Sequence, residues 1–230
     1  MKTKTFTGLS IAALCLLCMV LIYQKQEARL SKKKLVRCFP TGEMFPLKNS
    51  YARIVYDSVY QTIADFKLTD QNGSAVTSRL LKDKMYVANF FFTRCGSICP
   101  IMTKNISRLQ DEFKSETGIL FLSHTVDPEH DSVPVMFQYA QKHHIDSKKW
   151  HLLTGSRKEL YELSKSSYCL GVETDSPDNF QHSEKLVLID NHRIIRGYYD
   201  GTSPAEVDKL LQDIKILLLE TKREKSSLNN

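Results

Sequence analysis

Two continuous apolar segments constrain the fold of this chain more than any other feature. "MYVANFFFT" at 85–93 and "GILFLSHTV" at 118–126 have the length of strands, and neither alternates with polar residues. Such runs are typical of strands buried on both faces of a sheet. The stretch between them carries apolar residues at broadly helical spacing after a proline that the first turn of a helix tolerates: Pro100, Ile101, Ile106, Leu109 and Phe113. The segment therefore predicts a strand–helix–strand unit.

The rest of the folded part repeats this alternation. "IADFKLTDQNGSAV" at 63–76 alternates around an Asn-Gly turn and predicts a β-hairpin. Further helices are expected at 133–144, 156–168 (with Ser156 as N-cap and Glu159 three residues on) and 203–220 (with Ser203 as cap and Pro204 first), and further strands at 150–155, 184–190 and 193–201. The fold class is therefore α/β, a three-layer sandwich with an N-terminal hairpin.

The N-terminal segment has the features of a membrane anchor. Residues 6–23 carry no charged side chain and follow Lys2 and Lys4. No A-x-A-like cleavage site comes after them, and neither Cys15 nor Cys18 follows a small residue, so an uncleaved anchor is expected. The sequence thus divides into an anchor helix at 1–23, a basic linker at 24–60, a folded domain at 61–220 and a polar tail at 221–230.

The net charge of +6 is modest, and much of it follows the apolar stretch. The basic residues in this cluster are Lys25, Arg29, Lys32, Lys33, Lys34 and Arg37. That placement suits lipid headgroups or a solvated linker, whereas a nucleic-acid-binding domain needs basic residues spread over a folded face. The positive-inside rule alone would put the domain in the cytoplasm, while a basic start followed by an apolar run is the ordinary export signal.

Two of the six cysteines are spaced to act together. Cys95 and Cys99 are four residues apart, so on a helical turn both sulfurs would share one face. They follow a buried strand, and the adjoining helix N-terminus would stabilise a thiolate and lower its pKa. Thiolate is the form that binds a metal and the form that attacks a disulfide, so the pair supports either chemistry. Cys38 and Cys169 are either bystanders or an accessory pair.

The blocks around this pair resemble the Sco/SenC family of copper proteins that assemble cytochrome c oxidase. "FFFTRCGSICPIMT" is similar to the family's F-F-T-x-C-P-x-x-C-P-x-M, and "TVDPEHDSVPVMFQYA" to its V-D-P-x-x-D-T-x-x-x-L-x-x-Y-A. "FQHSEKLVLID" resembles the stretch that carries the family's histidine ligand. Gly96 and Ser132 depart from the pattern, standing where the family has proline and threonine. The resemblance covers about 56–219.

This resemblance implies a thioredoxin-like fold and a copper site made of Cys95, Cys99 and His182. It also implies a single-span protein of a bacterial inner membrane, or its mitochondrial equivalent, with the domain on the periplasmic, extracytoplasmic side. The implied function is delivery of copper to the binuclear copper site of cytochrome c oxidase, or preparation of that site's thiols. Two thiolates and one imidazole suit Cu(I) and accept Cu(II) with added oxygen or nitrogen ligands.

Alternatives remain at the level of sequence. Zinc would need a fourth donor, from His124, His130 or Asp127. The leading function is a metallochaperone without turnover, and the runner-up is a thiol-disulfide oxidoreductase with Cys95 as nucleophile and Cys99 as resolving thiol. A peroxidase and a purely structural tethered module explain the pair less well. Asp127 and Asp131 are expected to form turns or caps, with a role for Asp131 in orienting the site as the alternative. Surface roles are expected for His124, His130, His143, His144, His151 and His192, and core packing for Phe90, Phe91 and Phe92.

Overall fold

A computed structural model describes residues 4–30, 33–48, 54–170 and 183–228. The chain divides into two compact units, one formed by 1–35 with 213–230 and the other by 36–212. The second unit is built on a seven-stranded sheet with the strand order β4-β3-β7-β6-β5-β8-β9. Its strands are β3 (Lys67–Asp70), β4 (Ala75–Thr77), β5 (Met85–Phe91), β6 (Ile119–Thr125), β7 (Trp150–Thr154), β8 (Lys185–Ile189) and β9 (Ile195–Asp200).

The centre of the sheet is parallel and its edges are antiparallel. β5 pairs in parallel with β6, which pairs in parallel with β7. Every residue of β5 and β6 is buried, as the two continuous apolar runs predict. The expected hairpin is present as β3 with β4, and β8 with β9 forms the predicted late strand pair. Because β8 runs antiparallel to β5, the start of β8 and the end of β5 lie at the same edge of the sheet.

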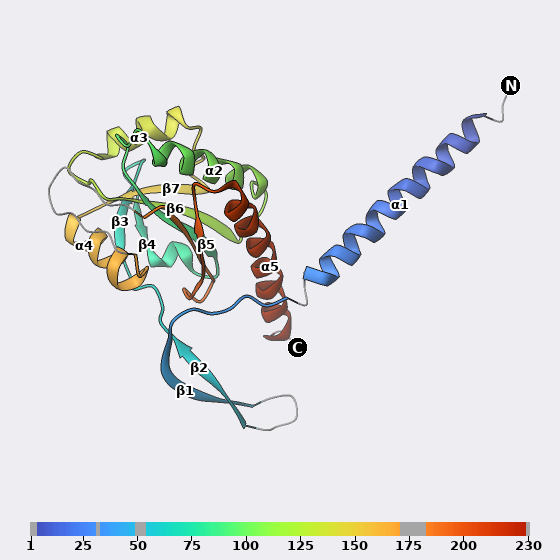
Figure 1. Cartoon of the computed structure of the whole chain (residues 1–230), viewed down its shortest axis with the longest axis horizontal. Helices are drawn as coiled ribbons and strands as arrows, with labels where there is room; N and C mark the ends of the chain where they lie inside the picture. Colours follow the sequence, from blue (N-terminus) through green and yellow to red (C-terminus); the bar gives the residue numbers. More distant parts are fainter. Residues whose placement is uncertain (1–3, 31–32, 49–53, 171–182, 229–230) are drawn as a thin grey trace. The chain divides into compact units, whose positions relative to one another are not determined.

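Helices cover both faces of the sheet, as a three-layer sandwich requires. α2 (Ile98–Glu112) and α3 (Val133–Lys142) lie on one face, and α4 (Arg157–Glu162) lies on the other (Figure 1). α4 continues into a π-helical turn, η2 (Leu163–Ser167), and the short helix η1 (Ser78–Leu81) precedes β5. The predicted cap is confirmed at α4, where the Ser156 hydroxyl accepts a 3.2 Å bond from the Glu159 N–H. α5 (Pro204–Leu228) begins at the predicted proline.

The segment expected to be a linker, 24–60, contains regular structure. α1 (Lys4–Leu30) continues seven residues beyond the predicted anchor, and β1 (Pro40–Lys48) pairs antiparallel with β2 (Ile54–Tyr60). The sequence did not predict this hairpin because its prolines and charged residues are typical of a linker. The hairpin starts with a bulge, and Gly42 has a φ of 88°. Within the residues that the structure describes, no helix is long and apolar enough to cross a membrane.

Candidate metal centre

Cys95 and Cys99 come together where β5 passes into α2. Cys95 lies in a turn closed by its own N–H to the Phe92 carbonyl at 3.2 Å, four residues after the end of β5. Cys99 is the second residue of α2 and is 1% exposed. The expectation that both cysteines lie on one helical turn is therefore wrong, because α2 begins only at Ile98. The turn nevertheless brings the two thiols within interaction distance of each other.

The start of α2 favours the charged form of Cys95. Burial by itself would raise the pKa of this thiol, but bonds to the backbone N–H groups of Cys99 and Ser97 and to both side chains lower it overall. The Sγ atom of Cys95 lies 3.7 Å from the Ser97 hydroxyl. Ser97 does not cap the helix with its side chain, so the first N–H groups of α2 are directed to the sulfur instead. Cys95 is thus a half-buried nucleophile or soft metal ligand.

The second thiol behaves in the opposite way. Burial is the main reason why the pKa of Cys99 is raised to about 12, and the negative charges of Cys95 and Asp131 also raise it. A hydrogen bond to the Phe92 backbone acts in the opposite direction and lowers the pKa. The prediction that the helix terminus lowers the pKa therefore holds for Cys95 and fails for Cys99. The pKa of Tyr139 of α3 is raised to about 12, mainly by burial, and the charges of both cysteines add to this shift. Its hydroxyl is 2.8 Å from that of Thr103.

A buried carboxylate holds the cysteine turn to the end of the neighbouring strand. Asp131 is fully buried and accepts bonds from the Thr93 N–H at 3.2 and 3.3 Å and from the Thr93 hydroxyl at 2.5 Å. The Thr125 hydroxyl donates to the same carboxylate. Of the two roles expected for Asp131, the structure favours orientation of the site. Thr93 follows β5 and Thr125 ends β6, so the parallel pairing of these two strands brings both threonines to the same carboxylate.

A second link is made on the exposed side of this turn. The Arg94 Nε donates a 2.8 Å bond to Asp127, whose backbone N–H is held by the Thr125 hydroxyl. Ligand atoms of Asp127, His130 and Asp131 lie within 4.8 Å of one another. Both carboxylates already accept bonds from Arg94 or the threonines, so this group is explained as a hydrogen-bond cluster. The turn role expected for Asp127 is confirmed, since its carbonyl accepts the Asp131 N–H at 2.8 Å.

His182, the third predicted ligand, lies outside the described residues. The residues that follow it are placed close to α2. Gly201 accepts the Asn105 side chain of α2 at its carbonyl, 2.8 Å away, and donates its N–H to the Glu184 carbonyl at 2.7 Å. A Cβ at Gly201 would meet both Met102 of α2 and Glu184. The chain therefore enters β8 beside the helix that carries Cys99.

Comparison with known proteins decides the family. The model of the SCO1/SenC family matches residues 56–218, which include both cysteines, Asp131 and His182. This chain belongs to the SCO1/SenC family. The sequence resemblance is thereby confirmed, and with it the thioredoxin-like α/β fold shared by solved SCO structures.

Three solved SCO proteins resemble this chain. A SCO1/SenC family lipoprotein from Bacillus anthracis str. Ames is 30% identical with a TM-score of 0.64, over 75% of this chain and 97% of that one. BsSco, in which a disulfide switch was identified and which belongs to a family of cytochrome c oxidase assembly proteins, is 26% identical (TM-score 0.60; 68% and 93% covered). Bradyrhizobium japonicum ScoI, solved with copper bound, is 27% identical (TM-score 0.55; 66% and 98% covered).

The departure from the SCO1/SenC pattern at position 96 has no steric cause in the fold. A Cβ at Gly96 would meet nothing within 4 Å, and its backbone is not in the left-handed region. The backbone at this position therefore has no need of a glycine. The only effect of a glycine at position 96 is therefore greater conformational freedom of this loop in the unfolded chain.

The zinc alternative receives no support from His124. His124 is fully buried among rings, stacked on Phe90 at 5.0 Å, and His151 lies 3.2 Å from Asp70 on the β7–β3 side of the sheet. The surface role predicted for His124 and His151 is wrong, since they are 0% and 9% exposed. His192 remains exposed.

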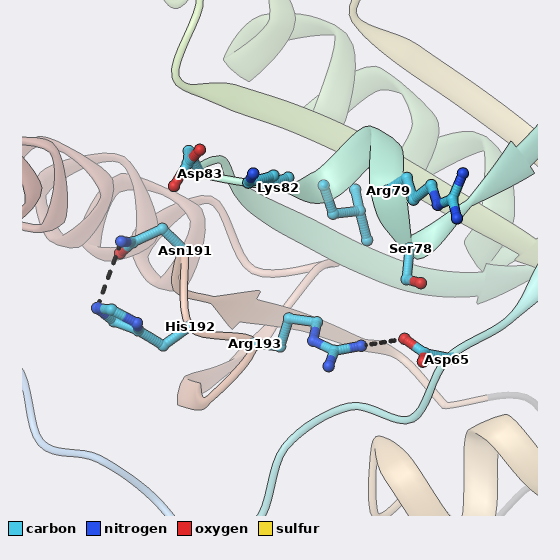
Figure 2. A pocket seen from close by; sticks show the side chains of 9 residues that line it. Asp65, Ser78, Arg79, Lys82, Asp83, Asn191, His192 and Arg193 are labelled. Carbon is cyan, nitrogen blue, oxygen red and sulfur yellow. Dashed lines mark hydrogen bonds and ion pairs between the residues drawn. The ribbon is translucent and has the colours of Figure 1, made fainter.

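His192 also lines a pocket of about 440 Å³ at the opposite end of β5 from the cysteines (Figure 2). This pocket lies between the residues that precede β5 and the turn that follows β8, where Arg193 pairs with Asp65. No cysteine lines it, so it is separate from the candidate metal centre.

Proposed function

We propose that this SCO1/SenC protein binds copper through Cys95, Cys99 and His182 and delivers it to the binuclear copper site of cytochrome c oxidase, or prepares the thiols of that site. The observation that carries the proposal is the thiol pair at the start of α2, with one sulfur accessible and the other sealed. Support comes from the relatives, one of which was solved with copper bound and another of which belongs to a family of oxidase assembly proteins.

The donor set fits copper as cargo. A soft ion such as Cu(I) prefers thiolate and imidazole and accepts few ligands. Cys95 is the thiol whose pKa is lowered, so it supplies the first thiolate. A bound cation would then lower the pKa of Cys99 and release its proton, because a coordinated thiol is deprotonated. The exposed side of Cys95 leaves room for an incoming ligand to take the metal away.

His182 is proposed as the third ligand from its place in the chain. The described residues after it, Ser183 and Glu184, lead into β8 at the sheet edge where β5 ends and the cysteine turn begins. Glu184 lies against Gly201 beside Met102, one helical turn after Cys99. The path of the described chain supports a ligand that comes shortly before Glu184.

Copper competition tests this proposal. The full chain in detergent, reduced and free of metal, is titrated with Cu(I) in the presence of a chromophoric Cu(I) chelator. We expect one copper per chain, loss of binding in Cys95→Ser and Cys99→Ser, and at least about tenfold weaker binding in His182→Ala. His192→Ala is the matched control, because His192 is exposed at the far end of β5, and it should bind copper like the wild type. Unchanged affinity in His182→Ala would remove the histidine from the site.

A second function is favoured by the asymmetry of the two thiols. Cys95, with its lowered pKa, suits attack on a client disulfide, which forms a mixed disulfide and releases one client thiolate. Cys99 would then attack Cys95, giving the Cys95–Cys99 disulfide and the second client thiol. This reaction makes the chain a thiol-disulfide oxidoreductase that consumes its own dithiol.

The two functions differ in what they require of His182. Reduction of a disulfide substrate by the wild type and by His182→Ala is followed under single-turnover conditions without copper. Equal rates, together with unaltered copper affinity in this variant, would favour the oxidoreductase. Slow reduction by both proteins, with copper affinity lost in the variant, would favour the copper carrier.

The proposal places the domain on the periplasmic side of a bacterial inner membrane. Its support is the uncharged stretch 6–23 and the exposed apolar side chains of α1, among them Leu14, Leu17, Leu21 and Ile22. In a bacterial host, the chain should resist extraction from membranes by alkaline carbonate and be digested by protease added to spheroplasts. Recovery in the soluble fraction, or protection from protease, would contradict this location.

A further inference from the structure

Two further cysteines each stand next to a residue that contacts one tyrosine of β9. The Tyr198 hydroxyl donates a 2.9 Å bond to the carbonyl of Tyr168, the residue before Cys169. The Tyr198 ring packs edge-on against Phe39, the residue after Cys38, with the ring centroids 6.3 Å apart. Two segments that are far apart in the sequence are therefore held on the same side chain, and each brings a cysteine.

Both cysteines act on the hydroxyl of Tyr198. The pKa of this hydroxyl is raised, first by burial and then by the charges of the Cys169 and Cys38 thiolates and by a bond to the Cys169 side chain. The bond to the Cys169 side chain acts only over a short distance, whereas the charge of Cys38 acts over a longer range. Cys38 is half-buried against the core and Cys169 is exposed.

The backbone around each cysteine is fixed. The Cys38 N–H donates a 2.9 Å bond to the Ile195 carbonyl of β9. On the other side, Leu170 exchanges two bonds with Ser164, N–H to carbonyl at 3.0 Å and hydroxyl to carbonyl at 3.1 Å. Both backbones are therefore anchored in the folded domain, each next to a residue that contacts Tyr198.

We propose that Cys38 and Cys169 form a second redox pair, independent of Cys95 and Cys99, which closes to a disulfide by exchange with a low-molecular-weight disulfide such as oxidised glutathione. The exposed Cys169 thiolate attacks one glutathione sulfur, so that a mixed disulfide forms and one glutathione thiolate leaves. The Cys38 thiolate then attacks the Cys169 sulfur and releases the second glutathione. Two protein thiols are oxidised, one glutathione disulfide is reduced, and the two thiol protons go to the two glutathiones.

Closure of this pair would lock the segment before β1 to the turn after η2. The bond encloses β1 through β7, including the turn that carries Cys95 and the start of α2. A cross-link over so long a loop constrains the unfolded chain strongly. The inference does not depend on copper, since neither cysteine belongs to the proposed metal centre.

The test uses the full chain in detergent with Cys15, Cys18, Cys95 and Cys99 replaced by serine, so that only this pair remains. The protein is equilibrated with glutathione redox buffers, alkylated, digested without reductant and mapped by mass spectrometry. We expect a peptide that joins Cys38 to Cys169, and a Tm at least about 5 °C higher in the oxidised form than in the reduced form. Adding Cys38→Ser should remove the cross-link and leave glutathione on Cys169.

The wild-type chain is treated and digested in the same way, as a control in case the serine variant misfolds. It should yield the same cross-linked peptide. Wild-type chain treated in denaturant is the control for the fold, and its yield of this peptide should fall at least about tenfold, because the segments are no longer held together. Separate glutathione adducts or alkylated thiols in both native proteins, without the joined peptide, would overturn the proposal.

Discussion

The carboxylate of Asp131 and the backbone of Thr93 form the main tie between the cysteine turn and the sheet. Both oxygens of Asp131 accept the Thr93 N–H, and the Thr93 hydroxyl adds a third bond. Thr93 stands two residues before Cys95, so the tie fixes where the turn leaves β5. The charge of the same carboxylate raises the pKa of Cys99. Asp131 therefore positions the turn that carries one thiol, and its charge adds to the burial that keeps the other thiol protonated.

Replacing Asp131 by asparagine should loosen this turn. The amide keeps the shape of the side chain but loses the charge and turns donor hydrogens toward the donors of Thr93 and Thr125. We expect a loss of about 3 kcal/mol of unfolding free energy, measured with urea, and at least about tenfold weaker copper binding.

Glu129→Gln provides the matched control for Asp131→Asn, because it removes a carboxylate of the same loop that pairs with Arg157 at the surface. Its stability should stay within about 1 kcal/mol of the wild type. If both variants lost stability equally, the special role of Asp131 would be refuted.

Metal-free protein should show two thiols of very different reactivity. Only thiolate reacts with iodoacetamide, so Cys95, whose pKa is lowered, should be alkylated first, and at neutral pH at least about tenfold faster than Cys99. As the pH is raised, the alkylation rate of Cys95 should be the first to reach its maximum. The rate at Cys99 should go on rising toward its pKa of about 12.

Peptide mapping by mass spectrometry after timed alkylation gives both rates in one sample. Cys95→Ser is a useful companion, because it removes a charge that raises the pKa of Cys99 but leaves the burial that dominates. Cys99 should stay slow in that variant. Similar alkylation rates at the two cysteines in the wild type would show that Cys95 is not more readily deprotonated than Cys99.

Local sequence signals predicted the helices, the strands and the cysteine pair. The contacts that position the site join residues far apart in the sequence, and local signals did not predict them. The buried strands at 85–93 and 118–126, the Ser156 cap and the Cys95–Cys99 pair were readable because each signal lies within a few residues. The tie from Asp131 to Thr93 depends on two strands pairing in parallel, which periodicity does not reveal. The same is true of the contacts that Phe39 and Tyr168 make with Tyr198, which join two segments far apart in the sequence. His182 as a ligand stays a prediction.

Gly96 offers a test of the one loop position where this chain departs most from its family. Gly96→Ala should raise the unfolding free energy by about 0.5 kcal/mol, because the added Cβ meets nothing within 4 Å and the unfolded chain loses freedom. Gly201→Ala is the contrasting variant, since its Cβ would crowd Met102, Leu186 and the Glu184 carbonyl. That change should cost about 2 kcal/mol. Urea denaturation measures both, and a destabilised Gly96→Ala would mean that the cysteine turn needs glycine after all.

His124 should make the domain sensitive to mild acid. It is fully buried, and among the described residues neither ring nitrogen has a hydrogen-bond partner. The rings around it belong to Phe90, Phe66 and Tyr168, none of which is charged at neutral pH. Burial lowers the pKa of His124 to about 4, with the Asn89 backbone opposing the shift. In the unfolded chain the pKa of this histidine is near 6.5. Between pH 6.5 and 4 the unfolded chain therefore binds a proton at His124 that the folded chain does not bind.

Stability should thus fall as the pH drops from 6.5 toward 4, by roughly 3 kcal/mol from this group alone, and level off below. In His124→Leu, a side chain of similar volume without nitrogen atoms, the contribution to the slope should vanish whatever the variant's stability at neutral pH. His192→Ala, at an exposed position, should keep the wild-type slope. Urea midpoints across this pH interval measure the three slopes, and equal slopes in the wild type and His124→Leu would mean that another group carries the acid sensitivity.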